Sequence, residues 1–123
     1  MLEAYSINQT VGANAPIEFE NVSIKKGCTA VTSGDSTINL NKCGVYMVSV
    51  DASAADSTTI QLYKNGVAQP QAQSTGTTPA FFTLVQVSHN NGNNCCESPV
   101  SLQVYNTTAT TLTNCNLVIT KIC

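Results

Sequence analysis

Apolar and polar residues alternate with a period of two along most of the chain. The longest such segment opens at Gly44. One of its faces carries Tyr46, Val48, Val50 and Ala52, and the opposite face carries Val45, Met47, Ser49 and Asp51. No stretch sustains the i, i+3, i+4, i+7 spacing of an amphipathic helix. The pattern therefore predicts an all-β fold.

Turn residues predict a hairpin in the middle of the chain. Residues 58–64 form its first strand, and Asn65-Gly66 supplies the two positive-φ positions of a type I′ turn. The returning strand, residues 67–73, contains Pro70. Because proline lacks an amide donor, this strand belongs on a sheet edge or at a bulge.

Five further segments complete the expected strands. Residues 29–33 and 36–40 form a second hairpin, and strands are expected around 100–104 and 115–119. Residues 80–88 are the most apolar segment, with large apolar side chains at both parities. We therefore expect one face of strand 80–88 to lie in the core and the other to lie against a second surface.

A chain of 123 residues fits one domain. The first 27 residues are the least regular, with short alternations at Tyr5 and Ile7 and at Ile17 and Phe19. We predict an N-terminal arm and edge strand over residues 1–27, followed by the β domain over 28–123.

Charged residues are few and include no arginine: the chain has five lysines and seven acidic residues. This excludes the basic footprint of a nucleic-acid-binding protein. The N-terminal residues show neither a positive region nor an apolar core of a secretory signal, and no segment has the length of a membrane span. We expect a protein made in the cytoplasm and released by lysis.

No catalytic or metal-binding constellation is visible in the sequence. His89 is the only histidine, and the carboxylates are scattered, so that Asp51 and Asp56 are at most a weak Ca²⁺ pair. Neither paired carboxylates nor an activated nucleophile can be defended. We expect no enzyme activity, no cofactor and no metal.

Cysteines are the residues with the most distinctive chemistry. Cys28 and Cys43 flank the Ser33-Gly34-Asp35 turn symmetrically, which predicts a disulfide across the hairpin of residues 29–40. Closing that loop of about 16 residues is worth about 3 kcal/mol. Pairing of the others, within or between subunits, stays open, as does a reduced, buried state; zinc is disfavoured because no Cys-x-x-Cys occurs. The disulfide candidates are Cys28, Cys43, Cys95, Cys96, Cys115 and Cys123.

Three features occur together over residues 29–122. Gly44-Val45-Tyr46 opens the long strand, Lys64-Asn65-Gly66 closes a hairpin, and an apolar strand ends the chain. In this order they resemble the tumour necrosis factor-like jelly roll, a family that includes the globular heads of complement proteins, spore-surface glycoproteins of bacilli and many phage appendage domains. The chain departs from that family in its cysteine-containing loop at 88–99.

The resemblance implies a jelly-roll β-sandwich that assembles as a homotrimer. The side chains that it would place at the threefold axis are Tyr63, Phe81, Phe82, Val85 and Tyr105. Our first hypothesis is a structural protein of a bacteriophage virion, a capsid decoration or head fibre that contacts capsid or other virion proteins through its N-terminal arm.

Two other roles stay open. One is a trimeric binding tip for a host glycan or protein, which the absence of aromatic residues from loops 74–79 and 88–99 disfavours. The other is a structural protein of the spore surface. An enzyme is the third and least supported class.

Overall fold

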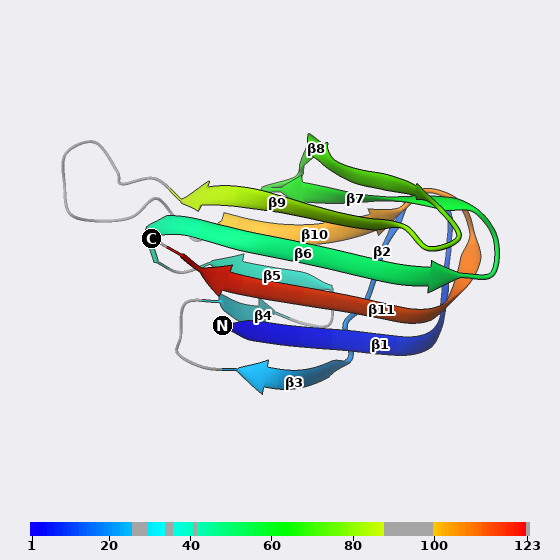
Figure 1. Cartoon of the computed structure of the whole chain (residues 1–123), viewed down its shortest axis with the longest axis horizontal. Helices are drawn as coiled ribbons and strands as arrows, with labels where there is room; N and C mark the ends of the chain where they lie inside the picture. The colour runs from blue at the N-terminus through cyan, green and yellow to red at the C-terminus, as the bar shows by residue number, and fades with distance from the viewer. Residues whose placement is uncertain (26–29, 34–35, 41, 88–99, 123) are drawn as a thin grey trace.

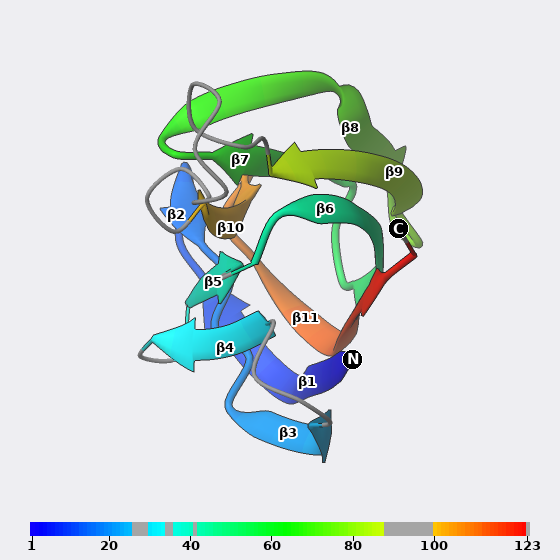
Figure 2. The same cartoon turned by 90° about the vertical axis from the view of Figure 1, so that its left-hand side faces the viewer.

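The computed structural model describes residues 1–25, 30–33, 36–40, 42–87 and 100–122. Within them the chain forms two antiparallel β-sheets that face each other across one core (Figures 1 and 2). Most strands run along the longest dimension of the molecule (Figure 1). The all-β, two-layer prediction is confirmed.

One sheet has five strands and the other has six. The five-stranded sheet runs in the order β3 (Asn21–Lys25), β1 (Leu2–Val11), β11 (Thr110–Lys121), β6 (Gly44–Ala54), β9 (Ala80–Val87). The six-stranded sheet runs in the order β4 (Ala30–Ser33), β5 (Thr37–Leu40), β10 (Val100–Asn106), β7 (Thr58–Lys64), β8 (Val67–Gly76), and β2 (Ala15–Pro16) also pairs with β10.

The core is made by the inward parity of each strand, as the alternation predicts. Tyr46, Val48 and Val50 of β6 are fully buried, and so are Ile60 and Leu62 of β7 on the facing sheet. The Tyr46 hydroxyl donates to the Lys42 carbonyl at 2.7 Å, which satisfies the one polar group of that side chain. Burial raises the pKa of Tyr46, and the hydrogen bond to Lys42 lowers it. Burial has the larger effect, so the pKa is raised overall.

The predicted hairpin between β7 and β8 is confirmed at its turn. Asn65 and Gly66 have φ values of 51° and 79°, as a type I′ turn requires. Asn65 is also hydrogen-bonded to the neighbouring strand. Its backbone amide donates to the Ser101 carbonyl, and its side-chain Oδ1 accepts from the Ser101 backbone amide, each at 2.8 Å. Pro70 lies in β8, which is an edge strand, as expected.

Replacing Asn65 by alanine is expected to lower the free energy of unfolding by about 1–2 kcal/mol, because the bond to Ser101 is lost and alanine tolerates positive φ poorly. Asn65→Asp keeps the acceptor and should stay within about 0.5 kcal/mol of the parent. Chemical denaturation of the two variants at one protein concentration measures the difference. Equal stabilities would show that the side-chain bond contributes nothing.

The predicted N-terminal arm is wrong for β1. This strand lies between β3 and β11, with Leu2 and Ala4 fully buried, and β3 occupies the edge instead. The sequence misled because the visible alternation, Tyr5 and Ile7, belongs to the outward parity. Residues 2–11 are therefore part of the sandwich and are not available as an anchoring arm.

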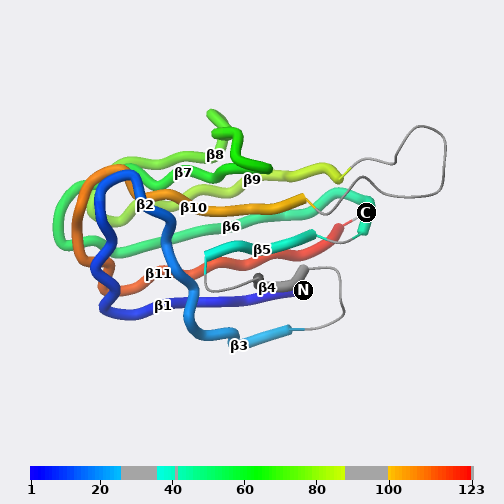
Figure 3. Tube along the Cα trace, turned by 180° about the vertical axis from the view of Figure 1, so that it is seen from behind, coloured from blue at the N-terminus to red at the C-terminus, as the bar shows by residue number. Residues whose placement is uncertain are grey.

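The segment after β1 crosses from one sheet to the other (Figure 3). Ile17 and Phe19 lie in it and are buried, although neither belongs to a strand. The Ile17 amide donates to the Val104 carbonyl at 2.7 Å, which fastens the crossing to β10. This segment closes one flank of the core.

Candidate subunit interface

Exposed apolar side chains concentrate on one sheet. Of the seven large hydrophobic residues that are exposed in the described part of the chain, six belong to the five-stranded sheet or to the residues next to its strands: Met1, Ile7, Val22, Phe82, Leu84 and Ile122. The seventh, Val67, opens β8 on the other sheet.

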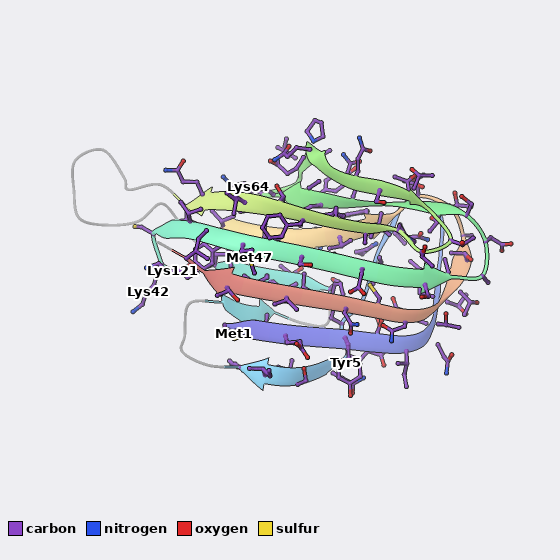
Figure 4. The ribbon with its side chains drawn as sticks, viewed as in Figure 1. Met1, Tyr5, Lys42, Met47, Lys64 and Lys121 are labelled. Carbon is purple, nitrogen blue, oxygen red and sulfur yellow. The ribbon has the colours of Figure 1, made fainter. Side chains whose placement is uncertain are left out.

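The strand register brings several of them together on the outward face of the five-stranded sheet. In β9, Phe82 is 59% exposed and pairs with Ser49, which pairs in turn with Val118 of β11. Two residues further along β9, Leu84 is 52% exposed and pairs with Met47. Figure 4 shows Met47 projecting from this face. We call the surface of Met47, Phe82, Leu84, Val118 and Ile122 the apolar face.

The other half of the same sheet surface is mainly polar, although Ile7 is exposed there. Asp51 pairs with Ala80 on one side and with Asn116 on the other, and Asn116 pairs with Tyr5. The apolar face therefore occupies the half of the sheet where β6 begins and β11 ends. A boundary between apolar and polar surface within one sheet is typical of a protein contact.

The outward surface of the six-stranded sheet is mainly polar. Gln61 pairs with Gln73, and the hydroxyls of Thr59 and Thr75 share a hydrogen bond of 2.6 Å. Its aromatic pair, Tyr63 and Tyr105, has ring centroids 4.4 Å apart, so these rings contact each other. This sheet is thus suited to face water.

The structure separates the five side chains that were expected at a threefold axis. Phe82 lies on the apolar face, whereas Phe81 and Val85 point into the core with 9% and 4% exposure. Tyr63 and Tyr105 lie on β7 and β10, in the opposite sheet. Strand β9 is apolar at both parities, so its sequence does not tell that Phe81 and Val85 face inward and Phe82 outward; a role of these side chains at a threefold axis stays a prediction.

Four residues of the apolar face were missed in the sequence. They are Met47, Leu84, Val118 and Ile122. A usable signal existed for Met47, because it alternates with the buried Tyr46 and Val48 and is nevertheless apolar. An apolar residue on the outward parity of a half-buried strand indicates a further contact surface.

Among the candidate cysteines, two lie in the described residues. Cys115 is fully buried and free; on either side of it in the sheet are Ser6 and Ala52. Cys43 is disulfide-bonded. Its expected partner Cys28, together with Cys95, Cys96 and Cys123, lies outside the described residues, so the pairing stays a prediction.

Cys115 is expected to resist alkylation while the protein is folded. Burial, reinforced by the charge of Asp51, raises the pKa of its thiol to about 12. Because the unfolded thiol ionises near pH 8.5, the neutral form stabilises the fold fully below that pH, and this contribution is lost as pH rises from about 9 to 12. Peptide mapping after iodoacetamide treatment at pH 8 measures the protection. Rapid labelling of Cys115 in the folded protein would contradict its burial.

The described residues contain no group of three or more potential metal ligands. Asp51 lies in β6 and Asp56 in the turn beyond it, where the Asp56 amide donates to Thr110 Oγ1 at 3.1 Å. His89 lies outside the described residues. In the described part of the chain, no helix has the length and apolar character that a membrane span needs.

A shallow cleft lies where β1 ends, lined by Gln9–Gly12, Ala15, Pro16 and Glu18, with a volume of about 270 Å³. The Gln9 amide group is already occupied: Nε2 donates to the Glu18 carbonyl at 2.6 Å, and Oε1 accepts from the Glu18 amide at 2.9 Å. These bonds fasten the crossing segment to β1. The cleft is therefore a structural junction.

Comparison with known proteins identifies a fold and no family. No family model matches, and no curated protein matches. The structure of rabbit GITRL is similar, with a TM-score of 0.60 and 11% identity over 100% of this chain and 95% of that one. A CBM35 domain from Paenibacillus barcinonensis, with a TM-score of 0.41, is 12% identical over 99% of this chain and 92% of that one. The tumour necrosis factor-like neighbour supports the jelly-roll prediction at the level of fold.

Proposed function

We propose that this chain is a non-enzymatic structural protein that assembles as a homotrimer through the apolar face. The observation that carries the proposal is the gathering of Met47, Phe82 and Leu84 on adjacent strands of one sheet, where a single sandwich leaves Phe82 and Leu84 exposed and Met47 half-buried. Burying one large apolar side chain stabilises a contact by about 1.5–3 kcal/mol. A surface of this kind is therefore expected to be covered.

A second copy of the same chain is the occupant that fits best. Between the apolar side chains lie the neutral hydrogen-bonding residues Ser49, which pairs with Phe82, and Thr120, which pairs with Met47. Neither side chain carries a charge that a neighbouring copy would bury. An arrangement about a threefold axis, on which the same sheet of each copy meets, would close such an assembly into a ring. The jelly-roll fold supports a count of three, in keeping with the family that the sequence resembles.

We further propose that the trimer is part of the surface of a bacteriophage virion. Support comes from the resemblance to phage appendage domains and from the sparse charge of the chain. The six-stranded sheet, with its Gln and Thr side chains, would then face outward. Its outward rings, Tyr63 and Tyr105, contact each other, which gives little support to a binding tip.

Quantitative mass spectrometry of purified phage particles tests this role. The expected result is that the chain co-purifies with the particles through a density gradient, at a copy number that is a multiple of three. Its absence from particles would contradict the proposal. Recovery from spore coats instead would assign the same trimer to the spore surface.

A further inference from the structure

We propose that one end of the sandwich, defined by Lys25, Lys42 and Lys121, docks electrostatically on a carboxylate-rich protein surface. The three lysines come from β3, from the residues just before β6, and from the end of β11. All three side chains are exposed. This lysine end would attach the structural protein proposed above to its partner, and the proposal rests on that function.

Strand pairing places the three lysines at one end of the molecule. Lys25 pairs with Leu2 at the start of β1, and Lys121 pairs with Tyr46 near the start of β6. Lys42 lies two residues before β6 begins. Figure 4 shows Lys42 and Lys121 projecting from this end, and β3 ends there in Figure 1.

The fourth lysine in the described residues lies near the same end but is engaged. Lys64 Nζ donates to the Gln86 carbonyl at 2.9 Å, close to the end of β9. Four of the five lysines in the chain therefore lie at this end, although the protein as a whole carries a net charge of −2. Such separation of charge steers a molecule toward an oppositely charged surface.

The carboxylates of the described residues lie mostly elsewhere. Asp56 is in the turn at the far end of β6, Asp51 is in the half of β6 nearer that turn, and Glu18 is held beside Gln9 near the end of β1. Glu3 is the exception, because it lies one residue from Leu2 and accepts from Ser23 Oγ at 2.7 Å. Among the side chains of the described residues, Glu3 is thus the carboxylate placed at this end, against three exposed lysine ammonium groups.

The chemistry of the lysine end favours carboxylates over phosphates. Arginine, whose fork binds phosphate in a bidentate manner, is absent from the chain. The lysines come from β3, from the end of β11 and from the residues before β6, and lysines on separate segments suit a broad acidic surface better than a single anion. In the proposed trimer, a threefold axis along the strands brings three lysine ends to the same side and multiplies weak contacts.

Fluorescence anisotropy with labelled poly-L-glutamate at low ionic strength tests the proposal, with the mass of each protein measured in the same buffer. The triple variant Lys25→Gln, Lys42→Gln, Lys121→Gln should bind the probe at least about tenfold more weakly, because each exposed pair contributes modestly and the contacts add across subunits. The matched control, Glu18→Gln with Asp56→Gln, should bind at least as well as the parent.

Three outcomes would overturn the proposal: no binding by the parent protein, equal binding by the triple variant, or tighter binding of an oligonucleotide or phosphatidylglycerol vesicles than of poly-L-glutamate. The parallel mass measurement separates this failure from failure of the trimer. A trimer that ignores poly-L-glutamate contradicts only the lysine end. A monomeric parent contradicts the proposed assembly.

Discussion

Replacing Phe82 and Leu84 together by aspartate is expected to convert the trimer into monomers of 12.9 kDa. Both side chains are more than half exposed in the single chain, so the sandwich itself loses little packing. At the proposed interface the substitution removes two apolar contacts per subunit and introduces carboxylates that would be buried without partners. Sedimentation velocity at several protein concentrations measures the change.

Val67→Asp provides the control for that experiment. Val67 is 63% exposed, comparable to Phe82, but it opens β8 on the opposite sheet. Its replacement should leave the mass at that of the parent. If the Phe82 and Leu84 variant stays trimeric while circular dichroism shows it to be folded, the apolar face is not the interface.

Replacing Asn106 by alanine is expected to lower the free energy of unfolding by about 2–4 kcal/mol. Asn106 is fully buried, accepts a hydrogen bond from Thr58 Oγ1, and donates through Nδ2 to the Thr108 carbonyl at 2.6 Å. The Thr108 amide in turn donates to Thr58 Oγ1 at 3.2 Å. Removal of the amide takes an acceptor from the buried Thr58 hydroxyl and a donor from the Thr108 carbonyl, and it leaves a gap in a buried polar network, which costs more than the bonds contribute when formed.

Gln103→Ala is the comparison for Asn106→Ala. Gln103 lies on the same strand, β10, on its outward parity, and its Nε2 donates to Thr37 Oγ1 at 3.1 Å. Its loss should cost less than about 1 kcal/mol, because water can replace the bond. Urea denaturation at one protein concentration compares the two, since the stability of an oligomer depends on concentration. Equal effects would contradict the role assigned to the buried network.

Much of the fold follows from local sequence chemistry. The alternation around Tyr46 and Val48 marks a core strand because one parity is continuously apolar. Asn65-Gly66 marks its hairpin because both residues tolerate positive φ. Such features depend on neighbours in sequence, and the structure confirms them.

The remaining features depend on pairing between distant segments. The N-terminal strand was misassigned because its inward residues include Ala4 and Ser6, which are too small to signal a core face. Strand β9 is apolar at both parities, so only its pairing with β6 decides that Phe81 is buried and Phe82 is exposed. The network of Thr58 and Asn106 is likewise invisible in sequence, since these residues are 48 positions apart.

The central claim is that the apolar face is the contact surface of a homotrimer. Light scattering coupled to size-exclusion chromatography, with and without reductant, tests it most directly. We predict a mass three times 12.9 kDa in both conditions, because apolar burial and not intersubunit disulfides would hold the subunits together. A mass of 12.9 kDa across the accessible concentration range would contradict the claim.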